Sequence, residues 1–218
     1  CGFSLDDISQ CETRLRFEGL ASVAEVWLNG NRLLQSDNMF MQHQLNISAV
    51  SQTENTLYIR ILALTPQLDA RKPRPKWRTP FVNHKNLSWF RTSQIGRIPT
   101  WSPPPAIIGP WLPVSVIQQR TLTLNACQLQ CSIEGNQGVV NANIELHALN
   151  GKSIDSVQLQ VASQKALLIK AQANGDEQPR YTGQLTLSNV QTWWPHTHGE
   201  PARYDAALIV TIDGQQHI

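Results

Sequence analysis

The sequence predicts an all-β protein made of two antiparallel β-sandwich domains, and three observations support this. Apolar and polar residues alternate with a period of two along most of the chain, whereas no segment shows a sustained helical stripe. Turn signals recur about every 8–12 residues through the second half, a spacing typical of sandwiches. The length of 218 residues, with 41% of them hydrophobic, suits two domains of about 100 residues each.

Three strands are expected in the first half of the chain, over residues 13–20, 23–28 and 55–64. Asn29-Gly30 follows the second of them and supplies the positive φ angles of a tight hairpin turn. The period of two places one set of apolar side chains toward the core of this domain. This set consists of Leu15, Phe17, Val26, Leu28, Leu57, Ile59 and Ile61.

The alternation stops between Pro66 and Pro113. This span holds ten of the 13 prolines and four of the seven tryptophans. It also holds eight of the 18 Lys and Arg residues against the single acid Asp69. Because disordered segments are poor in aromatic residues, we predict an ordered loop draped over the domain. The four tryptophans are Trp77, Trp89, Trp101 and Trp111.

Short strands resume after this loop, and Asn-Gly or Asp-Gly pairs separate several of them. About seven short strands in about 100 residues are typical of an immunoglobulin-like sandwich. We place the domain boundary near residues 118–121, which gives domains 1–118 and 119–218. The predicted strands cover residues 112–118, 121–133, 139–149, 156–163, 166–173, 181–188 and 206–212, with turns at 135–138, 150–151, 174–176 and 213–214.

Four cysteines are too few for a disulfide framework in a chain of this size. Cys127 and Cys131 lie on one face of a predicted strand, about 13 Å apart by the rise of a strand, and therefore cannot bond to each other. We interpret this pair as small apolar core residues. Cys1 and Cys11 could each pair with another group, but the sequence does not indicate which.

Several classes of protein are disfavoured by composition. No run of 18 apolar residues is present, so no transmembrane helix and no membrane partner are expected. A net charge of +2 does not indicate a nucleic-acid partner. The first residues lack the basic and apolar regions of a secretory signal, and the chain does not begin with methionine. We interpret it as a piece trimmed from a longer protein, whose compartment the sequence does not indicate.

No catalytic residue can be named. The acids mostly sit beside turns or on polar strand faces, which favours a solvated surface role. His196 and His198 with Glu200 form a conceivable metal cluster, but a pair without a third suitably spaced ligand is weak, and Gly199 indicates a turn. We therefore expect no metal and no cofactor.

The basic, tryptophan-rich loop has three possible roles. Its tryptophans could stack on sugar rings while its cations bond sugar hydroxyls. The same side chains could hold single-stranded nucleic acid by stacking and phosphate neutralisation. The third possibility, which we favour, is that the loop lies against another domain of a longer protein.

Residues 193–204 combine Trp193-Trp194-Pro195 with a His/Gly turn and with Tyr204 at the start of the next apolar run. This segment resembles the Trp-Trp-Pro…Gly…Pro…Tyr corner in the immunoglobulin-like second domain of glycoside hydrolase family 2, best in its β-mannosidase branch. The resemblance implies a structural role for Trp193, Trp194, Pro195 and Tyr204.

Motifs in the first half point the same way. Residues 15–20, 24–30 and 38–40 look like the galactose-binding-like, sugar-binding jelly roll that opens these glycosidases. Arg91, Gln94 and the stretch 101–114 resemble a β-mannosidase segment that reaches toward the substrate pocket. The resemblance therefore implies Trp101, Arg91 and Gln94 as candidates for the rim of that pocket.

One departure bears on the substrate. The family has Trp-Asp-Trp where this chain reads Pro99-Thr100-Trp101, so the carboxylate is absent at Thr100. The family's acid/base glutamate follows an asparagine at the end of a barrel strand, and this sequence contains no Asn-Glu pair. The alternating strands and helices of a barrel are missing as well.

The expected fold is thus all-β, with a jelly roll lacking its first strands followed by an immunoglobulin-like sandwich. The resemblance implies a non-catalytic, N-terminal fragment of a family 2 glycosidase similar to β-mannosidases. Its parent would hydrolyse terminal β-linked sugars with retention, in a C-terminal catalytic barrel that these domains would contact. The alternative is a free-standing carbohydrate-binding or adhesion module without hydrolytic activity.

Overall fold

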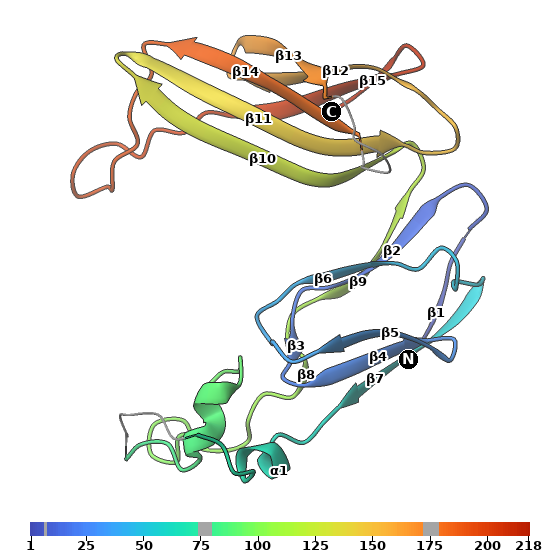
Figure 1. Ribbon diagram of the computed structural model, residues 1–218, viewed down its shortest axis with the longest axis vertical. Coiled ribbons are helices and arrows are strands. Elements are labelled where there is room, and N and C mark those ends of the chain that lie inside the picture. The colour runs from blue at the N-terminus through green and yellow to red at the C-terminus, as the bar shows by residue number, and fades with distance from the viewer. Residues whose placement is uncertain (7, 74–79, 172–178) are drawn as a thin grey trace. The chain divides into compact units, whose positions relative to one another are not determined.

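The computed structural model describes residues 1–6, 8–73, 80–171 and 179–218 and confirms an all-β protein (Figure 1). It divides into two compact units, Cys1–Gln119 and Arg120–Ile218. The predicted turn at 174–176 and Trp77 lie outside the described residues.

The first unit is built from short antiparallel strands. A four-stranded sheet has the order β1-β7-β4-β5, a three-stranded sheet the order β6-β2-β9, and β3 pairs with β8. Figure 1 shows the first two sheets as facing layers. The elements are β1 (Gly2–Ser4), β2 (Glu12–Phe17), β3 (Leu20–Ala21), β4 (Ala24–Leu28), β5 (Asn31–Ser36), β6 (His43–Asn46), β7 (Glu54–Ile61), α1 (Thr65–Leu68), the 3₁₀ helix η1 (Lys85–Trp89), β8 (Gly109–Pro110) and β9 (Val114–Gln119).

The core between these layers contains the residues that alternation predicts. Leu15 and Phe17 of β2 are 1% and 0% exposed, and they belong to one cluster with Val26, Leu28 and Leu57 of the opposite sheet. Each strand therefore buries alternate side chains against the other layer, which is the main source of stability in a sandwich.

The Asn29-Gly30 turn does more than reverse the chain. Both residues have positive φ, 50° and 84°, as the β4–β5 hairpin requires. The Asn29 side-chain amide donates hydrogen bonds to the carbonyl of Val50 and to Oδ1 of Asn55, each at 2.9 Å. Its Oδ1 accepts one from the backbone N–H of Thr56, also at 2.9 Å. The turn is thereby fastened to the start of β7.

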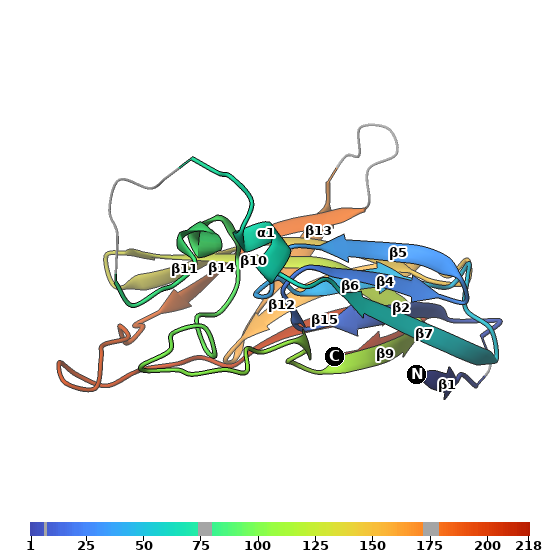
Figure 2. The same cartoon turned by 90° about the horizontal axis from the view of Figure 1, so that it is seen from below.

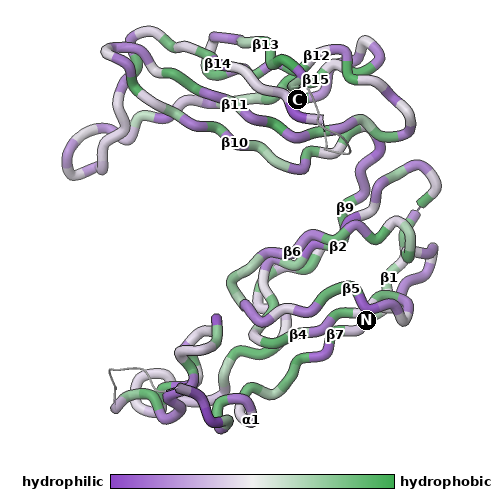
Figure 3. The backbone as a smooth tube through the Cα atoms, in the orientation of Figure 1, coloured by the Kyte–Doolittle hydropathy of each residue, from purple (hydrophilic) through white to green (hydrophobic). Residues whose placement is uncertain are grey.

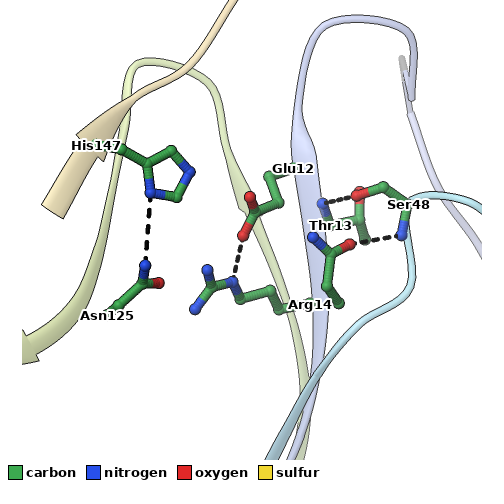
Figure 4. A network of polar contacts seen from close by, with 7 residues as sticks. Glu12, Thr13, Arg14, Ser48, Asn125 and His147 are labelled. Carbon is green, nitrogen blue, oxygen red and sulfur yellow. Dashed lines mark hydrogen bonds and ion pairs between the residues drawn. The ribbon is translucent and has the colours of Figure 1, made fainter. Parts of the chain in front are cut away.

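A second set of hydrogen bonds connects the segment between β6 and β7 to strand β2 (Figure 4). Thr13 is only 1% exposed, and its backbone N–H donates to Oγ of Ser48 at 2.9 Å. The N–H of Ser48 in turn donates to Oδ1 of Asn46 at 3.0 Å. Glu12 and Arg14, the neighbours of Thr13 on β2, form an ion pair with each other.

The second unit contains strands β10 to β16 in one continuous antiparallel order, β10-β11-β14-β13-β12-β15-β16. Strand β13 pairs with both β14 and β12, so the sheet passes from one layer of the sandwich to the other. Figure 3 shows hydrophilic and hydrophobic residues alternating along these strands. The strands are β10 (Leu122–Glu134), β11 (Gln137–Ala148), β12 (Ile154–Val161), β13 (Gln164–Lys170), β14 (Arg180–Ser188), β15 (Ala206–Ile212) and β16 (Gln215–His217).

The prediction for two cysteines was wrong. Cys127 and Cys131 do face the interior side of β10, because they lie opposite the buried Ile144 and Val140 of β11. Both thiols are nevertheless exposed, and both are free. Alternation correctly identified the face, but no neighbouring layer covers that part of it among the described residues.

Burial of His43 predicts a pH-dependent stability for the first unit. Nε2 of His43 lies 3.0 Å from Oγ of the buried Ser36, and desolvation lowers the pKa of this imidazole below its ordinary 6.5. Below that pH the unfolded chain binds a proton that the folded unit resists, so stability falls as the pH falls through this range. We expect His43→Gln to flatten the dependence of Tm on pH between 7 and about 5. The same change at the exposed His196 is the control, and an equal effect there would contradict the assignment.

Candidate functional site

The candidate site is the connection between β7 and β9, residues 62–113, which lies beyond one end of the first unit's strands (Figures 1 and 2). It has a small hydrophobic core of its own. Leu64, Leu68 and Leu87 of η1 are 4–6% exposed and form one cluster with Val23. The described part of the loop is therefore folded rather than merely extended over the surface.

Asn86 fastens the two helical turns of the loop to each other. Its side-chain amide donates to the backbone carbonyl of Leu68 at 2.7 Å and to that of Ala70 at 2.6 Å. The first of these carbonyls belongs to the last residue of α1 and the second lies just after the helix, where intrahelical partners are missing. One asparagine thus replaces the backbone hydrogen bonds that the short helix cannot make.

Arg91 belongs to the part of the loop that runs beside the β5–β6 connection. Its carbonyl accepts a hydrogen bond from the N–H of Met39 at 3.0 Å, and residues 38 and 91 form a parallel bridge. Met39 is 1% exposed, and its Sδ accepts the N–H of Ser93 at 2.8 Å. The backbone of Arg91 is therefore fixed while its side chain is exposed.

Trp101 sits in a tight turn closed by paired backbone hydrogen bonds between Ile98 and Ser102, at 3.2 and 2.8 Å. The hydroxyl of Ser102 also accepts the N–H of Gly96 at 2.7 Å. The indole of Trp101 stacks on Phe81 with ring centroids 4.8 Å apart and an interplanar angle of 27°. It remains 74% exposed, so this large aromatic side chain is held in place while much of its surface faces solvent.

The three predicted rim residues share one segment but have different anchors. Gln94 is exposed, and its carbonyl accepts the N–H of Arg97 at 2.9 Å in a turn between Arg91 and Trp101. Arg91 is held by Met39 and Trp101 by Phe81. Sequence reasoning missed Phe81, because its support of Trp101 arises only from the folding of the loop.

Arg97 was also missed. It lines a cavity of about 430 Å³ beside the loop, together with Ser22, Thr65 and several apolar residues. Desolvation lowers the pKa of its guanidinium below the ordinary value of arginine. No motif in the sequence distinguishes Arg97 from the other cations of the loop.

The other described tryptophans of this loop are engaged within the protein. Nε1 of Trp89 donates to the carbonyl of Pro73 at 3.3 Å, and Nζ of Lys72 lies 5.8 Å from its ring centroid. Nζ of Lys72 is closer to Phe90, at 4.5 Å. This lysine therefore contacts two aromatic rings of the same loop.

Trp111 anchors the loop to the first unit. Its Nε1 donates to the carbonyl of Met39 at 2.8 Å, and its ring meets Phe40 edge-on at 6.2 Å. Gly19 makes this approach possible, because a Cβ at that position would lie 2.4 Å from Nε1 of Trp111.

We expect Gly19→Ala to displace Trp111 and to lower the free energy of unfolding by about 1–3 kcal/mol, the usual cost of overpacking. Tryptophan fluorescence and chemical denaturation would measure both effects. Gly2→Ala is the matched control, since the nearest atom to its Cβ would be 3.7 Å away. A similar loss in both variants would contradict this role of Gly19.

The predicted corner at residues 193–204 connects β14 to β15. Trp193 bridges to Pro201, and the N–H of Trp194 donates to the carbonyl of Glu200 at 3.1 Å. The hydroxyl of Tyr204 accepts the N–H of Gln191 at 2.8 Å, which closes the base of the loop. The carbonyl of Pro195 accepts hydrogen bonds from the N–H of His198 at 2.8 Å and from the N–H of Gly199 at 3.1 Å. Both tryptophans are about half exposed, at 54% and 52%.

Carboxylates in both units pair with cations at the surface. Such pairs are typical of solvated faces and contribute little to stability. The described residues contain no group of three His, Cys, Asp or Glu side chains that could hold a metal ion. Besides Glu12–Arg14, the pairs between carboxylates and Arg or Lys in the described parts of the chain include Arg16–Glu18 at 2.9 Å, Arg32–Glu25 at 3.1 Å, Arg60–Glu25 at 3.5 Å, Lys152–Asp213 at 3.6 Å and Arg180–Glu145 at 3.7 Å.

Within the described parts of the chain, no helix is both long and apolar enough to span a membrane.

Comparison with known proteins identifies the family of the first unit. The family model described as glycosyl hydrolase 2 galactose-binding domain-like matches residues 2–112. Beta-mannosidase B of Thermothelomyces thermophilus is 26% identical over 214 residues, which cover 91% of this chain and 24% of that protein. Beta-mannosidase of Bos taurus is 23% identical over 223 residues, covering 93% of this chain and 25% of that protein.

A solved structure shows the same fold. The beta-D-mannosidase from Dictyoglomus thermophilum superposes with a TM-score of 0.74 at 19% sequence identity. The match covers 97% of this chain and 26% of that one. The chain thus spans about a quarter of the length of the relatives that it matches.

Proposed function

Since this chain belongs to the glycosyl hydrolase 2 galactose-binding domain-like family, we propose that its two domains form the non-catalytic N-terminal part of a longer glycosidase. That enzyme hydrolyses terminal β-linked sugars, in particular β-mannosides. It retains the configuration of the anomeric carbon, because the reaction passes through a covalent glycosyl-enzyme. The catalytic barrel lies in another part of the longer protein, and the two domains support it. The reaction needs no cofactor, and neither nucleic acid nor a membrane is a partner.

The chemistry of retaining hydrolysis supports this division of labour. The reaction requires an acid/base and a nucleophilic carboxylate about 5–5.5 Å apart, on opposite sides of the scissile bond. The sequence has no Asn-Glu pair that would match the family's acid/base glutamate. Five carboxylate side chains of the described residues instead face Arg or Lys side chains in ion pairs, namely Glu12, Glu18, Glu25, Glu145 and Asp213.

The loop 62–113 contributes to the rim of the substrate pocket in this proposal. The observation that carries it is the geometry of Trp101, which is 74% exposed yet fixed by its stack on Phe81. An exposed aromatic side chain held by a ring stack and by a hydrogen-bonded turn is prepared for stacking on a sugar ring, because little conformational freedom is lost on contact. Arg91 and Gln94 lie exposed on the same segment and offer hydrogen bonds to hydroxyl groups.

In the longer enzyme, we expect Trp101→Ala to raise KM for a β-mannoside about tenfold, equivalent to about 1.4 kcal/mol. Steady-state kinetics would measure the change. The free energy of unfolding should fall by no more than about 1.5 kcal/mol, because the exposed indole makes a single ring contact within the described residues, with Phe81. Trp89→Ala in the same loop is the control, since that indole bonds within the protein. Equal effects of the two changes would contradict the rim assignment.

A free-standing carbohydrate-binding module is the second candidate, favoured by the same exposed Trp101. Isothermal titration of the 218-residue chain with mannose and manno-oligosaccharides distinguishes the two. Scaffold domains that contribute only one side of a pocket should show no saturable heat in the millimolar range or below. Saturable binding that Trp101→Ala removes would favour the module and contradict our proposal.

A further inference from the structure

Strand β10 is an unusually open sheet edge. It runs for 13 residues, and among the described residues it pairs only with β11 (Figure 1). Natural edge strands are normally protected against pairing by charges, prolines or short length. From Leu122 to Ile133 the strand carries neither a charged residue nor a proline. Its only irregularity is a bulge between Leu124 and Ala126.

The interior-facing side of this edge is also open. Leu129 lies opposite the buried Ala142 of β11 and so points toward the sandwich, yet it is 39% exposed. Ile133 on the same side is 53% exposed. Both residues line an apolar groove of about 390 Å³ that also includes Val190 and Tyr204. An added strand would cover apolar surface here as well as satisfy backbone groups.

The sequence of the edge is self-complementary. Residues 127–131 read Cys-Gln-Leu-Gln-Cys, the same in both directions. Across a two-fold axis contacts are reciprocal: where residue i meets the partner's residue j, residue j meets the partner's residue i. A stretch that reads the same in both directions therefore brings identical residue types together at each of these positions. If two such strands pair antiparallel with the axis at Leu129, the leucines face each other. Gln128 then faces the partner's Gln130, and Cys127 faces the partner's Cys131.

The outer face of the edge presents no repulsion to such pairing. Gln128 accepts a hydrogen bond from Asn143 at 3.4 Å, and Gln184 donates to Asn141 at 3.0 Å. Close to Leu129, neutral amides therefore line this face of β10, β11 and β14, and the charged Glu145 and Arg180 farther along pair with each other. Amides can both donate and accept across the new strand pair.

We propose that two copies of this chain associate through antiparallel pairing of their β10 edges, centred on Leu129. The self-complementary sequence is the reason for choosing a second copy over an unrelated strand. The pairing extends the β14-β11-β10 layer across the two-fold axis into one continuous sheet.

The two cysteines provide a register-specific test. Opposite residues in antiparallel strands have Cα atoms about 4.5–5.5 Å apart, which lies within the range for a disulfide. An azo oxidant such as diamide converts the thiols of Cys127 and the partner's Cys131 into a disulfide. One molecule of diamide accepts the two electrons and two protons that each disulfide releases. In the same register, two copies of Cys131 lie about 13 Å apart along the strands and cannot bond.

The experiment uses the full 218-residue chain with Cys1→Ser and Cys11→Ser as background. Diamide should give a covalent dimer on a non-reducing gel. Adding either Cys127→Ser or Cys131→Ser should abolish the dimer, whereas a mixture of these two variants should restore it through one disulfide per pair. Cross-linking of a single variant alone, or none in the mixture, would overturn the register.

A second measurement needs no cysteine chemistry. Leu129→Lys places two ammonium groups opposite each other at the axis, where like charges disfavour strand pairing. We expect the dimer dissociation constant under reducing conditions to rise about tenfold by analytical ultracentrifugation. The control is Leu167→Lys, because Leu167 is 61% exposed on β13, which already pairs with two strands. A chain that is monomeric at all concentrations, or equal effects of both changes, would overturn the proposal and assign the edge to another occupant.

Discussion

Phe17→Ala is expected to lower the free energy of unfolding of the first domain by about 3–5 kcal/mol. Phe17 is fully buried on β2, in the cluster that joins the two facing sheets. Removing the ring leaves a cavity between these sheets, and strands held on both edges cannot easily collapse into it. β2 is paired on one edge with β6 and on the other with β9.

Chemical denaturation followed by circular dichroism would measure this loss, and hydrogen exchange would assign it to the first domain. Phe40→Ala is the matched control, because Phe40 is 58% exposed and meets only the edge of Trp111 in a described ring contact. We expect Phe40→Ala to lower the free energy of unfolding by only about 0.5–1.5 kcal/mol, the range for one aromatic pair. Comparable losses in the two variants would contradict the assignment of the core.

Gly96→Ala is expected to detach the turn that carries Trp101. Gly96 has a φ of +74°, and a Cβ there would lie 2.2 Å from the carbonyl oxygen of Pro105. The strain of positive φ costs about 1–2 kcal/mol, and overpacking against backbone adds about 1–3 kcal/mol. Because a loop can open locally, we expect the bond from Gly96 to Ser102 to break while the sandwich core stays folded.

Limited proteolysis between residues 94 and 106 and the indole N–H signal of Trp101 in NMR spectra would report this opening. Gly109→Ala separates the two causes, since Gly109 has a φ of +90° but no atom within 4 Å of its Cβ position. In this control, only the strain of the positive φ angle should destabilise the loop. If both variants open the loop equally, close contact with Pro105 is not what holds the turn.

Features with local causes were predictable from the sequence. The positive φ angles at Asn29-Gly30 follow from the residues themselves, as does the inward direction of Leu15 and Phe17. Strands β5 and β6 were not predicted. In β5 the adjacent Leu33 and Leu34 are both half-buried, and a bulge between Val26 and Trp27 disturbs the pairing, so the period of two is lost.

Features that depend on distant segments were not predictable. Alternation tells which side of β10 Cys127 faces, but it does not tell whether another layer covers that side. Likewise, the motif around Trp101 indicated a candidate rim residue, whereas its support by Phe81 depends on how the intervening loop residues fold back. The sequence therefore predicted candidate residues for the site but not the contacts that hold them in place.

The most direct test of the proposed function is an assay of the purified 218-residue chain with 4-nitrophenyl β-mannoside. Our account predicts no release of nitrophenolate above that from a heat-denatured sample, because the two carboxylates of the reaction lie elsewhere. Saturable turnover that scales with the concentration of this chain and is lost on denaturation would contradict it.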